Sequence, residues 1–331
     1  MSKSGRLESI NTLRGLIIIP VVAIHMNALI LEEAELYWKW MPSFLGNVTV
    51  LFCMISGFLF YEIHKRKELR VKDFWLSKMK NIGLPYLFYS LCAIALKIKS
   101  GLLTGSVWDV ILSIFSGEVF TVPFYYIPVI LTILMLAPIF MKGVQQGWLL
   151  GMSLTSLLVA LVLGRPFLLE FGENIVYFSA IFILGMAVSA YKKQTFRWLI
   201  DPKNLALCST AVVTLMTLQA TYLSDYEFHR YVSTLQKILL FPLLYVFLEK
   251  FPKAFGDFGT RVLDKLAQTS FAIFFMHMFI IKGLLMISGG QKFPPLLAQT
   301  CLLGGTILLC VIAAEIGKKI LKKKAKYIIA Y

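Results

Sequence analysis

Apolar residues run along this chain in long blocks, separated by short polar or basic stretches. An α-helix needs about 20 such residues to cross the hydrocarbon core of a bilayer. The pattern therefore predicts an all-α integral membrane protein, a bundle of about ten transmembrane helices. The expected spans cover residues 10–31, 46–63, 82–98, 123–142, 147–164, 175–191, 204–223, 231–249, 268–287 and 296–317.

The count of spans depends most on the shortest blocks, which begin near residues 82, 147 and 175. An odd number of crossings would place connections rich in lysine and arginine on both sides of the membrane. A further apolar stretch over residues 106–120 is expected to form an interfacial or re-entrant helix.

Composition agrees with this pattern. Of the 331 residues, 58% are hydrophobic, and the mean hydropathy is +0.75. Too little polar surface remains to cover a soluble globule, so we expect a multi-pass protein of the cell membrane. No second domain is indicated, and residues 1–331 form a single predicted transmembrane domain. The five cysteines lie singly inside apolar stretches, which indicates neither a disulfide framework nor a metal site.

The net charge of +15 is concentrated in a few connections. Lysine and arginine crowd residues 64–81, 192–203 and 250–265 and the tail 318–331, whereas the first connection, 32–45, is acidic. By the positive-inside rule, both termini and the basic connections face the cytoplasm, and 32–45 faces outward. This distribution favours anionic membrane lipids as partners and argues against nucleic acid.

Arg14 and His25 interrupt the first apolar block. They are eleven residues apart, which on an α-helix is about 1100° of rotation and about 16 Å of rise, so both side chains share one face. Ionisable side chains at membrane depth are costly to insert and tend to face a bundle interior or a water-filled cavity. The alternative is that Arg14 reaches the cytoplasmic headgroups and that His25 is a hydrogen-bonded interior residue. We favour a functional pair and take both as candidate catalytic residues.

Further motifs follow this pair. The second block reads LFCMISGFLF over residues 51–60, and a basic stretch ending in proline and tyrosine, FWLSKMKNIGLPY, covers 74–86. Later blocks contain an aromatic doublet followed by a proline, an F-x-x-G motif, and a serine that leads through aromatic residues to a histidine. These are Tyr125, Tyr126 and Pro138; residues 182–185; and SFAIFFMH over residues 270–277.

Together, and in this order, the motifs resemble the membrane-bound acyltransferase 3 family, in its stand-alone polysaccharide O-acetyltransferase type. The resemblance covers nearly the whole chain. Two places depart from the family pattern. Lys78 and Lys80 stand where arginines are frequent, and Tyr125 with Tyr126 replaces the more usual tryptophan and phenylalanine.

The resemblance implies an acyltransferase that moves an acetyl group from cytoplasmic acetyl-CoA, its co-substrate, to a hydroxyl of a cell-envelope, capsular or lipid-linked glycan. No metal is implied. The chemistry of the residues is compatible with this. An imidazole such as His25 can take the acceptor proton near neutral pH, or can itself carry the acyl group. The sequence leaves both routes open.

Three cations are candidates for binding the donor phosphates: Lys78, Lys80 and Arg70. For each, a lipid-facing charge that sets the topology is an equally good interpretation. A smaller group is expected to line the site or bind the acceptor: Ser56, Tyr125, Tyr126, Ser270 and His277.

The alternatives for this group are structural. Ser56, beside Gly57, fits close helix packing, and the two tyrosines fit an interfacial belt. For His277 we favour a structural or substrate-orienting role over catalysis.

A second function class remains open at this point. A transporter or flippase of a lipid-linked polysaccharide intermediate would also be polytopic, but it should show more ionisable residues along a path and paired broken helices. Within the enzyme class, O-succinyl transfer is an alternative to O-acetyl transfer. The sequence does not decide whether the chain forms a homo-oligomer.

Overall fold

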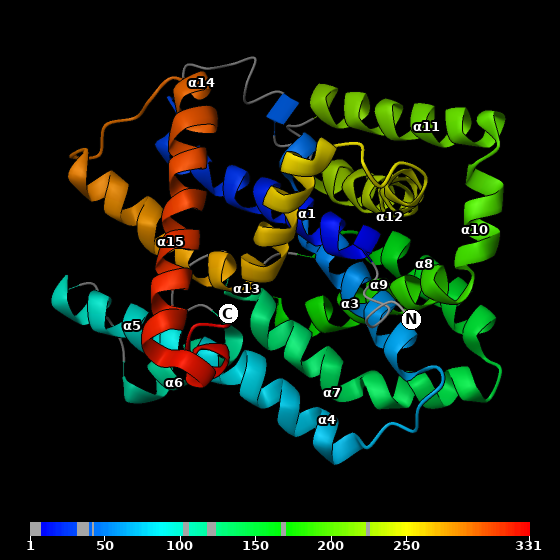
Figure 1. Cartoon of the computed structure of the whole chain (residues 1–331), viewed down its shortest axis with the longest axis horizontal. Helices are drawn as coiled ribbons and strands as arrows, with labels where there is room; N and C mark the ends of the chain where they lie inside the picture. Colours follow the sequence, from blue (N-terminus) through cyan, green and yellow to red (C-terminus); the bar gives the residue numbers. More distant parts are fainter. Residues whose placement is uncertain are drawn as a thin grey trace.

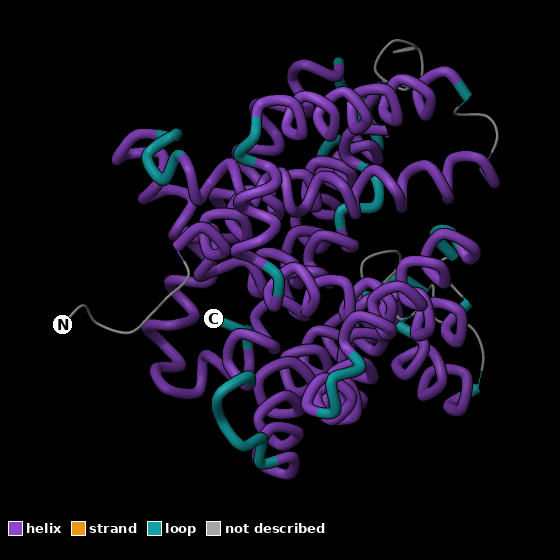
Figure 2. The backbone as a smooth tube through the Cα atoms, turned by 90° about the vertical axis from the view of Figure 1, so that its right-hand side faces the viewer, coloured by secondary structure: helices purple, strands orange, loops and turns teal. Residues whose placement is uncertain are grey.

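The computed structural model describes residues 8–31, 40–41, 43–101, 106–117, 124–166, 170–222 and 226–331. These ranges are almost entirely helical (Figure 2), and their only β contact is an isolated bridge between Ile30 and Phe293. The expectation of an all-α protein is therefore confirmed.

The helices follow one another in the order shown in Figure 1. They are α1 (Glu8–His25), α3 (Thr49–His64), α4 (Val71–Lys78), α5 (Leu84–Lys99), α6 (Val107–Ser116), α7 (Tyr126–Gln145), α8 (Leu149–Leu163), α9 (Phe171–Ala190), α10 (Lys192–Leu199), α11 (Pro202–Thr221), α12 (Tyr226–Lys250), α13 (Gly256–Ile287), α14 (Pro295–Leu297), α15 (Leu303–Leu321) and α16 (Ala325–Ile328). Short 3-10 or π-helical turns join some of them: η1 (Met26–Leu29), η2 (Met79–Gly83), η3 (Ala298–Leu302) and η4 (Lys322–Lys324).

Nine helical segments in the described ranges are long and apolar enough to cross a membrane. Each matches one predicted block, so the chain is a multi-pass membrane protein. The tenth block, 147–164, forms α8, whose 15 residues fall below the usual length of a span. The stretch near 106–120 contains the short helix α6, as expected, and four of its large apolar side chains are exposed: Val107, Trp108, Leu112 and Phe115.

The charge pattern nonetheless favours a crossing by α8. If α8 crosses, the basic connections at 64–70, 191–203 and 250–256 all lie on one side of the membrane; if it does not, the last two move to the opposite side. At about 1.5 Å per residue, α8 spans about 22 Å, which a locally thinned bilayer can accommodate at modest cost. We therefore expect ten crossings, with both chain ends in the cytoplasm.

Glycines set the closest helix crossing. A Cβ added to Gly57 of α3 would lie 1.9 Å from the carbonyl oxygen of Phe182 in α9, and a Cβ added to Gly185 would lie 2.2 Å from the carbonyl oxygen of Met54. Each glycine thus lets the partner backbone approach, as small residues do in membrane bundles. The resemblance motifs at 51–60 and 182–185 meet at this crossing.

At the centre of the bundle, α1 packs against α13, between α12 and α15 (Figure 1). Gly15 allows the contact, because a Cβ there would lie 2.1 Å from the carbonyl oxygen of Leu263. Polar side chains reinforce it, since Asn11 donates a hydrogen bond to Asp264. This pairing positions the residues of the candidate site.

A π-helical turn joins α4 to α5 at the basic segment. Pro85 lacks the N–H that would bond to the carbonyl of Asn81, and the preceding turn, η2, is widened. The widened turn follows directly on Lys78. Phe74 of α4 packs against Phe60 and His64 of α3, which fixes α4 beside the bundle.

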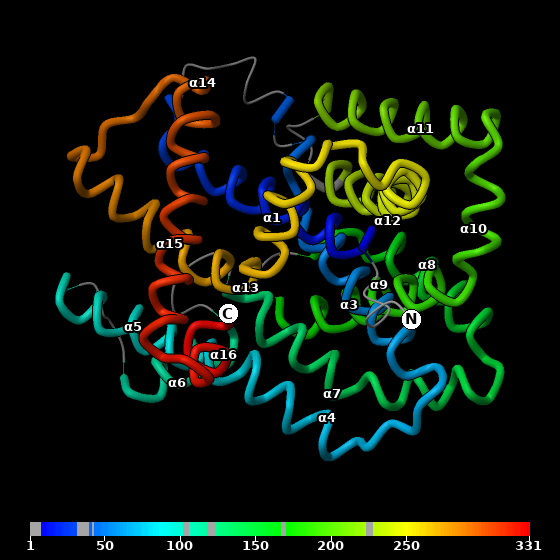
Figure 3. Tube along the Cα trace, in the orientation of Figure 1, coloured from blue at the N-terminus to red at the C-terminus, as the bar shows by residue number. Residues whose placement is uncertain are grey.

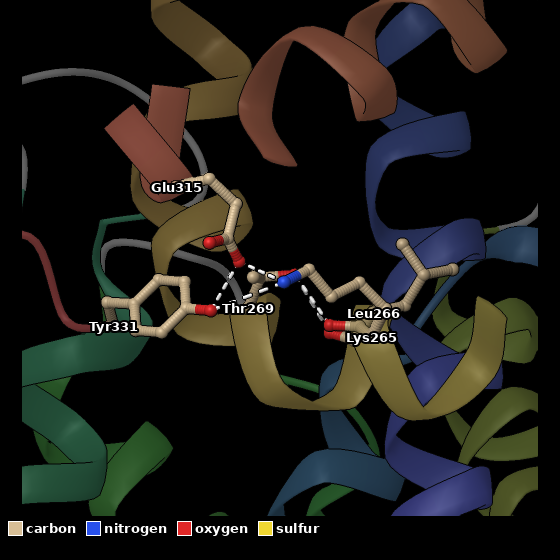
Figure 4. A network of polar contacts seen from close by, with 5 residues as sticks. All are labelled: Lys265, Leu266, Thr269, Glu315 and Tyr331. Carbon is tan, nitrogen blue, oxygen red and sulfur yellow. Dashed lines mark hydrogen bonds and ion pairs between the residues drawn. The ribbon is translucent and has the colours of Figure 1, made fainter. Parts of the chain in front are cut away.

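The last residues fold back beneath α15, and α16 lies against α5 (Figure 3). Figure 4 shows the polar network that fixes them: Lys265 of α13 forms an ion pair with Glu315 of α15, and the hydroxyl of Tyr331 donates to the same carboxylate. The ammonium of Lys318 also lies 4.1 Å from the centroid of the Tyr331 ring. These contacts tie the chain end to α13 and α15.

The α3 and α9 crossing can be tested with two glycines of the same helix. Gly185→Ala should lower stability by about 1–3 kcal/mol, the usual cost of overpacking, because the new methyl group meets the Met54 carbonyl. Gly172→Ala is the matched control, since nothing lies within 4 Å of a Cβ there. The measurement is thermal unfolding of the purified proteins in detergent. Equal stability of the two variants would contradict the close crossing.

The topology can be tested by labelling single cysteines with a membrane-impermeant reagent in a cysteine-free background. Lys72→Cys and Lys193→Cys should stay unlabelled in intact cells, and Ser288→Cys should be labelled, since ten crossings put the first two inside. Labelling of Lys193→Cys from outside would show that α8 does not cross.

Candidate functional site

His25 is the last residue of α1, at a point where the helix leaves backbone carbonyls without helical partners. The side chain of Gln299, from η3, donates a hydrogen bond of 3.0 Å to the carbonyl oxygen of Ala23. The chain then continues as the 3-10 turn η1. Gln299 therefore holds the end of α1, and with it the backbone that carries His25.

The rings of His25 and His277 lie beside each other, with centroids 5.2 Å apart. His277 is fully buried on the face of α13 that packs against α1, and its Nδ1 lies 2.9 Å from the carbonyl oxygen of Ile273. A carbonyl oxygen can only accept, so Nδ1 carries the proton in the neutral ring and Nε2 keeps its lone pair. This Nε2 is buried and has no hydrogen-bond partner among the described residues.

Eleven residues before His25, Arg14 also faces α13. Its guanidinium donates a hydrogen bond of 2.9 Å to Oγ of Ser270, and that hydroxyl donates one of 2.9 Å to the carbonyl oxygen of Ala267. Both residues of the pair on α1 thus contact α13, through side chains seven residues apart, at 270 and 277.

One cavity, of about 250 Å³, lies at the Arg14 end and is called here the Arg14 cavity. Its walls are mostly apolar, and none of the described residues that line it is an aspartate or a glutamate. Its cations come from α1 and α4, whose Lys78 ammonium lies 5.1 Å from the centroid of the Phe74 ring. The polar lining residues are Arg14, Ser56, His64, Lys78, Tyr126 and Ser270.

A second cavity, of about 210 Å³, lies at the His25 end and is called here the His25 cavity. It is lined by His25, by Tyr125, and by basic residues from the end of α8 and the start of α12. Asn47, Thr49 and Ser233 add neutral polar groups. The basic residues are Arg165, His229 and Arg230.

Phe274 lines both cavities. It lies one turn before His277 on α13, and the centroids of these two rings are 6.1 Å apart. The aromatic doublet divides in the same way, because Tyr126 lines the Arg14 cavity and Tyr125 lines the His25 cavity. Two compartments therefore meet at one aromatic side chain next to the histidine pair.

The structure brings together most, but not all, of the residues selected from the sequence. Arg14, Ser56, Lys78, Tyr126 and Ser270 share the Arg14 cavity. His25 and Tyr125 share the other, with His277 beside His25. Arg70 and Lys80 are exposed and line neither cavity.

Arg165, Arg230 and Phe274 are site residues that the sequence analysis did not select. Phe274 is hidden within an ordinary apolar block. Arg165 did leave a signal: it is an arginine in a connection that the positive-inside rule places outside, where such charges are scarce.

The comparisons with known proteins identify the family of the chain. The acyltransferase 3 family model, described as an acyltransferase domain, matches residues 7–315. The chain therefore belongs to the acyltransferase 3 family and is a membrane acyltransferase. No curated protein and no solved structure matches the chain.

The two lysines of the basic segment provide a test of the Arg14 cavity. Lys78→Ala should raise the KM for the acyl donor about tenfold, as expected for loss of one hydrogen bond to a charged group, with a smaller effect on kcat. Lys80→Ala is the matched control, because Lys80 is exposed outside the cavity. The measurement is steady-state kinetics with acetyl-CoA as the donor. Equal KM values for the two variants would indicate that Lys78 helps to set the membrane topology and does not bind the donor.

Proposed function

We propose that this acyltransferase moves an acetyl group from cytoplasmic acetyl-CoA to a hydroxyl of a cell-envelope, capsular or lipid-linked glycan. The observation that carries the proposal is the position of His25. It lies beside His277 and lines one cavity, and among the described residues only Phe274 is common to that cavity and the one lined by Arg14 and Lys78.

The Arg14 cavity suits the donor. Lys78 belongs to the basic segment that the positive-inside rule places in the cytoplasm, and it offers a cation for the phosphates of acetyl-CoA. The apolar walls accept the rest of the donor arm. No carboxylate belongs to the lining in the part of the chain that the structure describes, which favours an anionic ligand.

The transfer itself needs a base at the His25 cavity. The acceptor hydroxyl attacks the thioester carbonyl carbon, a C–O bond forms, and the C–S bond breaks. The imidazole of His25 takes the hydroxyl proton and returns it to the departing thiolate of CoA. Arg14, held by Ser270, lies about 16 Å along α1 from His25, so it supplies positive charge for the anionic part of the donor in the Arg14 cavity and not for the reacting sulfur.

His277 acts as a positioning residue in this scheme. Its ring is fixed by the Ile273 carbonyl and packs against His25, so it limits the orientations that the His25 ring can adopt. In a second route, His25 first accepts the acetyl group and then passes it to the acceptor. Rapid quenching with acetyl-CoA alone, followed by mass spectrometry, separates the routes, because only the second leaves an acetylated protein.

The central test is His25→Ala in the purified protein. Loss of a general base typically lowers the rate by about 10² to 10⁴, and His25→Gln should fail almost as badly because it takes no proton at neutral pH. The stabilisation of the protein by acetyl-CoA should remain, since His25 does not line the Arg14 cavity. The measurements are acetyl transfer and the donor-induced shift in Tm.

A His25→Ala protein that kept more than about a tenth of the wild-type rate would show that His25 is structural. His277 would then be the candidate base. The acceptor class is tested separately, by proton NMR of envelope glycans from cells that lack the gene and from cells that carry wild type or His25→Gln. Acetyl signals that do not depend on the gene would contradict a glycan acceptor.

A further inference from the structure

The charge of the His25 cavity is one-sided. Its lining contains the guanidinium groups of Arg165 and Arg230 and the imidazoles of His25 and His229, and among the described residues it contains no aspartate or glutamate. The Nδ1 atom of His229 is buried and makes no hydrogen bond among the described residues. A neutral glycan hydroxyl would not need such a lining.

Arg165 has only neutral partners. Its guanidinium lies 4.6 Å from the ring centroid of Phe178 and 5.4 Å from that of Tyr125, and it donates hydrogen bonds to the Tyr125 hydroxyl and, over 3.5 Å, to Oδ1 of Asn174. Within the described ranges it forms no ion pair with a carboxylate. The positive charge is thus held in place by rings and amides and is not neutralised by them.

Backbone contacts fix the position of Arg165 without a bound ligand. Gly164 ends α8 with φ +59°, and a Cβ there would lie 2.7 Å from the Tyr231 ring. The backbone N–H of Arg165 donates to the carbonyl oxygen of Arg230 over 3.1 Å, and the guanidinium of Arg230 donates to the carbonyl oxygen of Leu163. The end of α8 and the start of α12 are therefore joined, and both arginines are presented to the same cavity.

Partial burial of the Arg165 charge costs hydration free energy, and a bound anion would offset this cost. An arginine at the edge of the membrane, half-buried among aromatic rings, loses hydration, and ionisable residues at such depth tend to mark substrate sites. The planar guanidinium fork matches the oxygens of a carboxylate or a phosphate.

We propose that the acceptor carries an anionic group, a carboxylate or a phosphate, which Arg165 binds with Arg230 beside it, so that a neighbouring hydroxyl lies against His25. The acceptor class is therefore an acidic sugar or a phosphate-linked sugar. This inference rests on the proposed function for the transfer step, but the binding itself does not depend on catalysis.

The test measures ligand-induced shifts in Tm of the purified full-length protein with three acceptor probes. Hexyl glucoside is neutral, hexyl glucuronide carries a carboxylate, and farnesyl phosphoryl glucose carries a phosphate. Wild type should be stabilised by at least one anionic probe and more weakly by hexyl glucoside, and the comparison of the two anionic probes shows which source is used.

Arg165→Gln should weaken binding of the preferred anionic probe by about tenfold or more, the factor expected for a hydrogen bond to a charged group, and should leave the weak response to hexyl glucoside unchanged. Arg165→Lys should recover part of the affinity, because the charge remains without the fork. Arg197→Gln is the matched control, since Arg197 is an exposed arginine on α10 that lines neither cavity.

Equal stabilisation by all three probes, or by none, would overturn the inference. An Arg165→Gln protein that kept the wild-type preference for an anion would also overturn it. Loss of the response to the neutral probe and to acetyl-CoA as well would overturn it too, because it would show that Arg165 only maintains the local structure. Acetyl-CoA turnover is measured in parallel. Anion binding that persists without any turnover would count against the proposed function and leave the anion site standing.

Discussion

The pairing of α1 with α13 is the contact on which the rest of the structure depends. Gly15 removes the side chain that would otherwise hold the two backbones apart, because a Cβ would lie 2.1 Å from the Leu263 carbonyl oxygen. The same interface carries the Arg14 and Ser270 hydrogen bond and the neighbouring imidazole rings of His25 and His277. The close backbone contact and these polar side chains therefore lie in the same interface. A disturbance of the packing would also displace the residues proposed to take part in acyl transfer.

The polar groups at membrane depth are held in defined orientations by specific contacts. Gln299 satisfies the end of α1, the Ile273 carbonyl fixes the proton on His277, and aromatic rings surround Arg165. The last two contacts leave Nε2 of His277 without a hydrogen-bond partner among the described residues, and leave the charge of Arg165 in the lining of the His25 cavity. In a medium without water, an unpartnered polar group is costly, which is why such groups are expected where a substrate will meet them.

Motifs that are far apart in the sequence lie together in the folded structure. The block at 51–60 and the F-x-x-G motif at 182–185 form the α3 and α9 crossing, and the first of them also contributes Ser56 to the lining of the Arg14 cavity. The aromatic doublet divides between two cavities, with Tyr126 in one and Tyr125 in the other. Adjacent residues on a helix point about 100° apart, so a doublet can serve two compartments at once.

The sequence by itself determined the class of the molecule, since blocks of about 20 apolar residues admit only membrane-spanning helices, and it selected Arg14 and His25 because charged groups in such blocks need a reason. It predicted nine of the spans well. The tenth block, 147–164, forms the shorter α8, because the length of an apolar stretch does not show where a turn such as 145–148 begins. Only the tertiary structure separated Lys78 from Lys80, and brought Phe274 and Arg165 to the histidine pair. The physical reason is that helical periodicity states which residues share a face of one helix, whereas a cavity is formed by faces of several helices, and the crossings that join those faces are set by long-range packing.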